Sequence, residues 1–397
     1  MLHPPLLALV AATLLPAEAH GFVPAPAHGT LPRRAVLLGT PAAAVLTAAA
    51  PPAAALSSLP FEHSLTSVDI AGAVIPVAVW RPRKTAPTTA APPPPPPYPY
   101  KIDIGKIAAK LRVGWLSWLP TFDYALPCGA VAAAPLLSSD GSGFGRARDG
   151  DAILFAHGFL GSVYDFAHAA EALAADGFTV IAPELPESLC ASYIPPDGLG
   201  REEIIAAARE LVGAEEGARW GIFGHSAGAG SSLLQPGEYR LGRAAFAGGA
   251  GRIARYASRD PLFLCSSNGD GCNRFMGLGA DADLRPLLTA DDGPTTTTLF
   301  TSLDEAYASP REAPPPRGAF VFADDNSPAP LPSHISFLWS EVDDAMVSLL
   351  SPLLPLAKAL GLFLLDFDVY RENRDAERTA AALVPALRRF FLVSSAR

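Results

Sequence analysis

After Gly150 the chain alternates short apolar runs with amphipathic segments. Residues 152–156 and 220–223 are mostly apolar and are bounded by turn residues, which is typical of buried strands. Between them, residues 201–212 carry apolar side chains at helical spacing. The pattern also predicts helices at 164–175 and 374–391 and strands at 178–182, 244–247, 297–301 and 319–322. This alternation predicts an α/β fold built on a doubly wound, mostly parallel sheet with helices on both faces.

Upstream of Gly150 the pattern is less regular. Alternating apolar positions at 68–70 and 74–79 predict two short strands around a turn at Ala71 and Gly72. Residues 104–111 predict one helix, and the proline-rich stretch 84–100 predicts an exposed loop.

The first 57 residues resemble targeting signals more than folded structure. An apolar run at 6–15 ends in Ala-Glu-Ala, and a twin arginine at 33–34 precedes a second weakly apolar stretch. The Gly-Phe-Val-Pro at 21–24 resembles the start of a plastid transit peptide. Together these features predict a cleaved multipartite leader, a plastid location, specifically the thylakoid lumen, and one folded domain over 58–397. The alternative is one secretory peptide followed by an Ala/Pro-rich tail, which would make the protein secreted or endomembrane.

Composition narrows the classes of function. Apolar residues make up 49% of the 397 residues and charged residues 17%, so a large core is expected. The net charge of −9 argues against a nucleic-acid partner, because no basic surplus is present to neutralise phosphates. No Cys-x-x-Cys pair or Cys/His cluster is present, so neither a metal nor a cofactor is predicted. Cys265 and Cys272 bracket a Gly/Asn/Asp loop, and either a local disulfide or two reduced, buried thiols fits that spacing.

A Gly-x-Ser-x-Gly motif at 224–228 is the strongest chemical signal in the chain. It directly follows the predicted strand 220–223 and precedes small residues suited to the start of a helix. A nucleophile elbow needs this setting, in which the serine lies on a sharp strand-to-helix turn. Ser226 is therefore the predicted nucleophile.

The same fold logic predicts the oxyanion hole. One backbone N–H should come from Ala227, just after the nucleophile, and one from the loop after the strand 152–156, with Phe159 as the donor. His157 precedes the nucleophile strand, so we expect it to orient this loop and not to act as the base. His225 is expected to point away from the reacting face and to be structural.

The general base follows from chain order. In this fold the order is serine, acid, histidine, and seven of the eight histidines precede Ser226. Only His334 remains, on a loop after the predicted strand 319–322. It is the predicted base that accepts the serine proton.

The acid is chosen in the same way. Asp304 follows the predicted strand 297–301, one strand before His334, and is the preferred acid. Other carboxylates remain open, and these are Asp260, Asp270, Glu305, Asp324 and Asp325.

Residues 153–160 with Tyr164, continuing to 177–185, resemble the chlorophyllase family and its platelet-activating-factor acetylhydrolase-like relatives. The likeness covers roughly residues 68–340. It implies an α/β-hydrolase fold and cleavage of a carboxylic ester that has a long apolar alcohol or acyl part.

The family motifs carry over onto Ser226, Asp304, His334 and the Phe159 loop. Plant chlorophyllases usually place arginine after the serine, where this chain has Ala227. In many relatives the acid follows the strand after the nucleophile, and here that strand leads into an Ala/Gly segment without a carboxylate.

The segment 346–367 is strongly apolar but is interrupted by Pro352, Pro355 and Lys358, which makes it a poor membrane span. Over 340–367 we expect either an inserted helix packed on the core or a cap over an apolar substrate groove.

The sequence therefore predicts a serine ester hydrolase. Chlorophyll, cleaved to chlorophyllide and phytol, is the leading substrate because the resemblance and the leader agree. A lipase or phospholipase acting on plastid glycerolipids is the alternative, and the same residues would also serve acyl transfer to an alcohol. The expected partners are a small apolar ester and a peripheral contact with a membrane surface, while the oligomeric state is left open.

Overall fold

The structure is a computed structural model, and it describes residues 59–83, 95–110, 114–129, 145–189, 196, 198–211, 218–248, 260–267, 270, 296–300, 317–322, 331–351 and 376–396. The strands are β1 (Phe61–Ile70), β2 (Ala73–Pro82), β3 (Tyr98–Asp103), β4 (Thr121–Leu126), β5 (Ala152–Ala156), β6 (Thr179–Pro183), β7 (Trp220–His225), β8 (Gly242–Phe246), β9 (Leu262–Ser267), β10 (Thr296–Phe300) and β11 (Arg317–Phe322). The helices are α2 (Ile104–Lys110), η2 (Gly114–Leu116), α3 (Ala167–Ala175), α4 (Arg201–Leu211), α5 (Ala227–Leu234), η3 (Ile335–Phe337), α10 (Ser340–Leu350) and α13 (Ala376–Ala396).

A nine-stranded sheet organises the domain, in the order β1-β2-β6-β5-β7-β8-β9-β11-β10. The pairs β1–β2 and β2–β6 are antiparallel, and every other pair in this sheet is parallel. The carboxyl ends of the parallel strands therefore meet at one edge, where β7 ends at His225. This mostly parallel sheet with crossover helices is the α/β-hydrolase fold.

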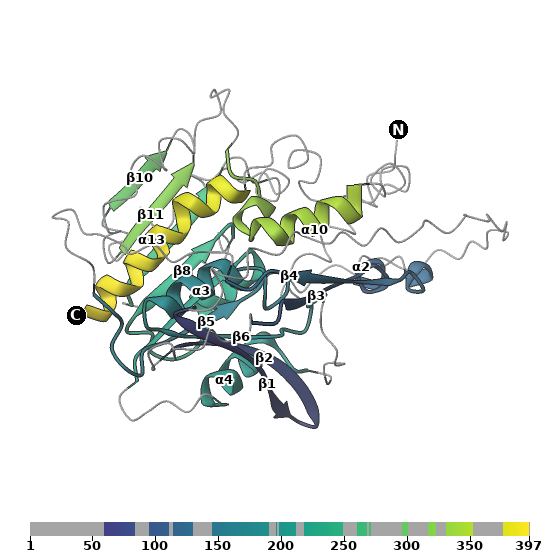
Figure 1. Ribbon diagram of the computed structural model, residues 1–397, viewed down its shortest axis with the longest axis horizontal. Coiled ribbons are helices and arrows are strands. Elements are labelled where there is room, and N and C mark those ends of the chain that lie inside the picture. Colours follow the sequence, from purple (N-terminus) through teal and green to yellow (C-terminus); the bar gives the residue numbers. More distant parts are fainter. Residues whose placement is uncertain are drawn as a thin grey trace, which may run out of the picture.

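Helices cover both faces of the sheet, as Figure 1 shows for α3 and α13 on one side and α4 on the other. The central strand β5 explains this, because all five of its side chains are buried. Ile153 and Phe155 belong to the core under α3 and α13, while Leu154 belongs to the core under α4. A strand that is apolar on both faces needs a layer on each side.

The β3–β4 hairpin forms a second, two-stranded sheet, with α2 and η2 between its strands. In Figure 1 this part extends away from the large sheet. Its first strand alternates strictly, with Tyr98, Tyr100 and Ile102 buried in the main core and the residues between them facing outward. The hairpin is therefore anchored to the domain through one face of β3.

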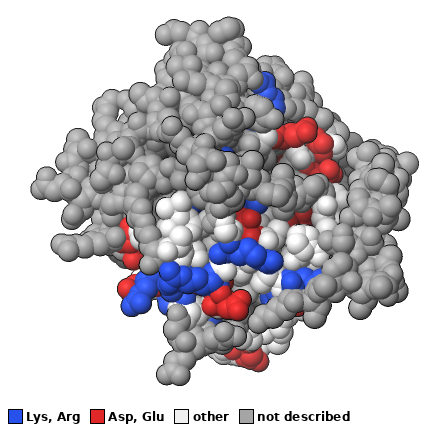
Figure 2. Space-filling view, turned by 60° about the vertical axis from the view of Figure 1, so that its left-hand side comes forward, with Lys and Arg blue, Asp and Glu red and all other residues white. Residues whose placement is uncertain are grey.

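The described surface mixes charges of both signs. On the face in Figure 2, lysine and arginine side chains lie among aspartate and glutamate side chains. One ion pair and one hydrogen bond from an arginine fasten α13 to the rest of the domain. Arg388 binds Asp176 at 2.8 and 2.7 Å, and Arg219 binds both Asp151 and the backbone of Ser395.

Arg243, on β8, lies at the end of α5, the helix that follows Ser226. Its Nε donates to Asp260 Oδ2 at 2.7 Å. Its other nitrogens donate to the backbone carbonyls of Ser232, Leu233, Gln235 and Gly237, at 2.8–3.2 Å. A cation at this position satisfies carbonyls that a helix end leaves without partners and complements the helix dipole.

Most of the predicted elements are confirmed. Each strand predicted after residue 150 is present, with ends displaced by at most two residues. The helices predicted at 164–175, 201–212 and 374–391 are α3, α4 and α13, and the predicted first hairpin is β1–β2, longer than expected. The prediction missed β9 and the β3–β4 hairpin.

Other predictions concern residues outside the described ranges. The leader at 1–57 and most of the proline-rich loop at 84–100 lie there. Of the predicted insert at 340–367, the structure describes α10 and Ser351. No helix in the described ranges is long and apolar enough to cross a membrane.

The Arg243→Met variant should lower the free energy of unfolding by about 3–5 kcal/mol, because it leaves Asp260 and the end of α5 without their buried cation. Urea denaturation followed by circular dichroism measures this change. Arg240→Met, which breaks only the exposed pair with Glu238, is the control and should leave the midpoint unchanged. Equal effects of the two variants would contradict this role of Arg243.

Candidate active site

Ser226 lies on a sharp turn between β7 and α5, as the sequence predicted. Its φ of 56° and ψ of −120° are an uncommon conformation for a residue with a side chain. Its own N–H donates to Phe246 O at 2.9 Å, which ties the turn to the neighbouring strand. A Cβ at Gly224 would collide with Gly228 O, and one at Gly228 would collide with Ala156 O. Only glycine permits so close an approach of backbones at either position.

His334 and Asp270 complete a hydrogen-bonded series with Ser226. His334 Nε2 lies 3.0 Å from Ser226 Oγ, and His334 Nδ1 lies 3.0 Å from Asp270 Oδ2. A carboxylate accepts, so the proton of a neutral imidazole belongs on Nδ1 and leaves Nε2 free to accept from the serine hydroxyl. Asp270 is fully buried and His334 nearly so. Water therefore competes little for the hydrogen bond between His334 and Asp270.

The structure corrects the predicted acid. The place beside His334 Nδ1 that was expected for Asp304 is taken by Asp270, three residues beyond the end of β9. Asp304 lies outside the described residues, as do the rivals Glu305, Asp324 and Asp325. The remaining rival, Asp260, is paired with Arg243.

Asp270 was only one of several open alternatives in the sequence analysis because β9, the strand before it, was not predicted. The sequence indicated a loop between Cys265 and Cys272, and no strand was predicted before it, although residues 262–265 form an apolar run and all of β9 is buried. An apolar run that ends in Asn-Gly-Asp is a signal for a strand with a carboxylate at its carboxyl end.

His225 holds the main chain of His334. Its Nε2 lies 2.8 Å from His334 O, and because a carbonyl only accepts, Nε2 carries the proton. The two rings lie 4.8 Å apart. Burial, followed by the nearby charge of His334, lowers the pKa of His225 well below its ordinary value, so its ring stays neutral. The structural role predicted for His225 is confirmed.

His157 fixes the loop after β5, again as predicted. Leu185 N–H donates to His157 Nε2 at 2.9 Å, so Nδ1 carries the proton that bonds Gly158 O at 2.8 Å. Burial lowers the pKa of His157 to about 3, and the positive charge of Arg201 adds to this effect. The ring is thus a neutral clamp that connects the loop to the segment after β6.

The loop places Gly158, the residue before Phe159, next to Ser226. A Cβ at Gly158 would lie 3.2 Å from Ser226 Cβ, and Gly161 N–H donates to Gly158 O at 3.1 Å to close the turn. Ala227 is the first residue of α5, where a helix has backbone N–H groups without intrahelical partners. Phe159 and Ala227 therefore lie where the sequence predicted the two oxyanion donors, and that role remains a prediction.

Two buried carboxyl groups, those of Asp165 and Glu184, lie near the loop that follows β5 and are uncharged at acidic pH. Asp165 Oδ2 accepts from Ser162 N–H at 3.0 Å, and burial raises the pKa of Asp165 to about 8. Burial also raises the pKa of Glu184 to about 7. Below these values both groups are neutral, so they do not oppose negative charge that develops at the oxyanion position.

Cys265 is a free, buried thiol on β9, and the disulfide considered for Cys265 and Cys272 is wrong. Burial raises the pKa of the Cys265 thiol far above its ordinary value, which makes it unreactive. Cys272 lies outside the described residues. Among the residues that the structure describes, no group of histidine, cysteine and carboxylate side chains is arranged to hold a metal.

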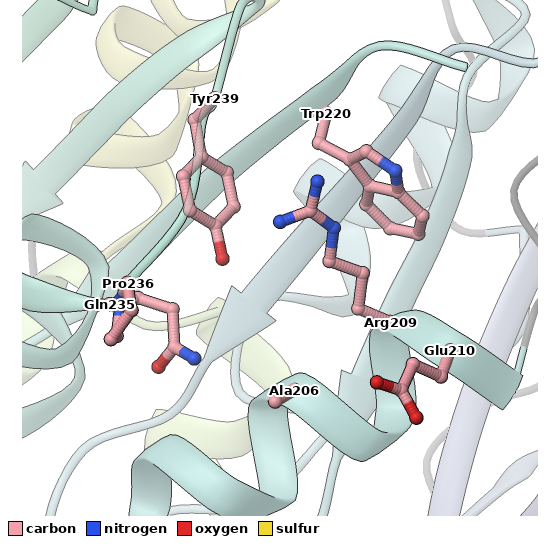
Figure 3. Close-up of a pocket in the computed structure, with 7 residues that line it drawn as sticks. All are labelled: Ala206, Arg209, Glu210, Trp220, Gln235, Pro236 and Tyr239. Carbon is pink, nitrogen blue, oxygen red and sulfur yellow. The ribbon is translucent and has the colours of Figure 1, made fainter. Parts of the chain in front are cut away.

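A separate hollow of about 470 Å³ lies at the opposite ends of the strands. Figure 3 shows Arg209 reaching between Tyr239 and Trp220, the first residue of β7. The guanidinium carbon lies 5.1 Å from the centre of the Trp220 ring and 5.3 Å from that of Tyr239. Ser226 follows the other end of β7, so this hollow is not part of the site that contains His334.

Comparison with known proteins shows no family for this chain. No protein-family model matches the chain, and no curated protein matches it. Among solved structures, it is similar to XC6422 from Xanthomonas campestris, described as an α/β serine hydrolase without lid, at 15% identity and a TM-score of 0.37, over 69% of this chain and 86% of that one. TT1662 from Thermus thermophilus matches at 13% identity and a TM-score of 0.34, over 69% of this chain and 91% of that one. An acylaminoacyl peptidase from Pyrococcus horikoshii matches at 12% identity and a TM-score of 0.34, over 69% of this chain and 38% of that one.

Replacing the acid distinguishes the observed arrangement from the predicted one. Asp270→Asn should lower kcat about 10⁴-fold on an ester substrate, because an amide no longer holds the imidazole in the tautomer that accepts the serine proton. Asp304→Asn is the matched control and should retain nearly full activity. Circular dichroism checks that both variants are folded. If Asp304→Asn were inactive and Asp270→Asn active, Asp304 would be the acid.

On the acid side, the pH dependence of kcat/KM should reflect the protonation of a single group. Protonation of His334 removes the acceptor for the proton of the serine hydroxyl. The pKa of a free imidazole is about 6.5. The pKa of His157 is held at about 3 and that of His225 is also lowered, so neither should titrate between about pH 4.5 and 8.5. A plot of log kcat/KM should fall with unit slope on the acid side. A slope of two, or a flat profile, would contradict His334 as the single base.

Proposed function

We propose that this protein is a serine hydrolase of carboxylic esters, with Ser226 as nucleophile, His334 as general base and Asp270 as the group that orients the base. One observation carries the proposal, the unbroken series from Asp270 Oδ2 through both nitrogens of His334 to Ser226 Oγ, with each link at 3.0 Å. A serine hydroxyl is a poor nucleophile until a neighbouring imidazole takes its proton, and this arrangement supplies that imidazole.

The reaction proceeds in two halves. Ser226 Oγ attacks the ester carbonyl carbon while its proton passes to His334 Nε2, and the oxyanion is held by the N–H groups of Phe159 and Ala227. The bond to the alcohol oxygen then breaks, and the alcohol leaves with the proton from Nε2. Water gives a proton to His334 Nε2 and attacks the acyl carbon. The bond to Ser226 Oγ then breaks, Nε2 returns the proton to Oγ, and the carboxylic acid leaves.

The proposed substrate class is an ester with a long apolar part, and chlorophyll is the substrate to test first. Two sequence features support this choice, the resemblance of residues 153–160 and 177–185 to chlorophyllases and the plastid-type leader. A plastid glycerolipid is the second substrate, since the same acyl-enzyme would form on it. Acyl transfer would replace water by an alcohol in the second half of the reaction. The corresponding location is the plastid, specifically the thylakoid lumen, with a secretory route as the alternative.

Ser226→Ala should reduce hydrolysis of a short p-nitrophenyl ester about a millionfold in kcat and abolish labelling by a fluorophosphonate probe. Ser64→Ala, at an exposed position on β1, is the control and should leave both unchanged. The rates of hydrolysis of chlorophyll a, a galactolipid and the p-nitrophenyl ester, measured with one enzyme preparation, rank the three substrates. Fluorophosphonate labelling that persists in Ser226→Ala would contradict the assignment of Ser226 as the nucleophile.

A further inference from the structure

The hairpin β3–β4 with α2 and η2, residues 98–110 and 114–126, forms an arm that extends from the domain (Figure 1). Two indole rings are exposed at its far end. Trp115 on η2 is 67% exposed and Trp118 in the next turn is 71% exposed. The exposed fraction of both side chains is larger than that of any other large apolar side chain in the described residues, of which Val74 is the next at 58%. Single exposed apolar residues are ordinary, but two tryptophans three positions apart on a projection indicate an interaction surface.

The turn that carries the two indoles is packed against α2. A Cβ at Gly105 on α2 would collide with the Ser117 carbonyl oxygen, which shows that the helix lies directly against the turn between the tryptophans. Ser117 N–H also closes that turn by donating to Gly114 O at 3.1 Å. The turn is therefore held against α2 while both rings face outward.

The base of the arm is fixed to the catalytic domain. Tyr98 OH donates to Glu171 Oε1 on α3 at 2.8 Å and accepts from Trp80 Nε1 at 2.8 Å. The Tyr98 ring stacks on Tyr164, with centroids 5.0 Å apart and an interplanar angle of 23°. Tyr164 follows the oxyanion loop by three residues. The exposed indoles therefore have a defined position relative to the catalytic site.

The charge of the arm differs from that of the chain. Its described residues hold three lysines and two aspartates, whereas the whole chain has a net charge of −9. Both aspartates have partners within the arm: Asp103 caps α2 by accepting from Lys106 N–H at 2.8 Å, and Asp123 pairs with Lys101 at 3.5 Å. Lys110 ends α2 close to the tip and is exposed.

We propose that Trp115 and Trp118 insert into the interfacial region of a lipid bilayer, with Lys110 beside anionic headgroups. An indole has a large apolar body and one polar N–H, which is why tryptophan collects at the headgroup level of membranes. A nearby lysine adds attraction to anionic lipid. The consequence for substrate delivery rests on the proposed function: the arm would hold the active site at the surface where a long-chain ester is dissolved.

Vesicle co-sedimentation of the full chain tests the proposal. The wild type should bind phosphatidylcholine vesicles that contain an anionic phospholipid, with a blue shift of tryptophan emission. Trp115→Ser/Trp118→Ser should weaken binding at least tenfold, and Lys110→Gln should weaken it only on anionic vesicles at low salt. Leu65→Ser/Val74→Ser, on the exposed β1–β2 hairpin, is the matched control and should bind as the wild type does.

Hydrolysis of a soluble p-nitrophenyl ester separates this proposal from the proposed function. The double tryptophan variant should keep that activity and lose activity on vesicle-borne ester, while Ser226→Ala should lose both activities and still bind vesicles. Absence of vesicle binding by the wild type, or unchanged binding by the double variant, would overturn the proposal. A dimer in solution that the double variant abolishes would also overturn it, by assigning the indoles to a second copy of the chain.

Discussion

The close approach of α5 to the carboxyl ends of β5 and β7 is the constraint on which the rest of the site depends. It puts Ser226 into a strained conformation, of a kind that costs on the order of 1–3 kcal/mol and persists only when the surroundings hold it. Glycine at 224 and 228 makes the approach sterically feasible. The bond from Ser226 N–H to Phe246 O fixes the turn laterally, and Arg243 holds the far end of α5. Three adjacent strands thus support one serine hydroxyl.

The base is held at two separate points. Asp270 fixes the imidazole of His334 through Nδ1, while His225 fixes its main chain through the carbonyl. His225 is the residue before the nucleophile, so the elbow that aims the hydroxyl also positions the residue that receives its proton. Since burial keeps His225 neutral, it donates one hydrogen bond to that carbonyl without placing a second cation beside the base.

Local patterns predicted most of the fold and two members of the hydrogen-bonded series. The elbow needs a strand, two glycines and a serine in direct succession, and His334 is the single histidine after Ser226. The acid depends instead on the order of strands in space. Counting back one strand along the chain from His334 leads to β10, but β11 lies between β9 and β10 in the sheet, so β10 is at the edge. The order of elements along the chain does not reveal this order of strands in the sheet, and β9, the strand that precedes Asp270, was not predicted.

The missed hairpin had a different cause. The alternation of buried positions in β3 is complete, but Pro99 within it and the prolines before it favoured a loop. The buried tyrosine of that strand has consequences for the site. Tyr98 packs on Tyr164, beyond the oxyanion loop, and lies 6.2 Å from Trp339, which follows η3 and His334. The base of the arm therefore contacts two segments next to the candidate site, the one that follows the Phe159 loop and the one that follows His334.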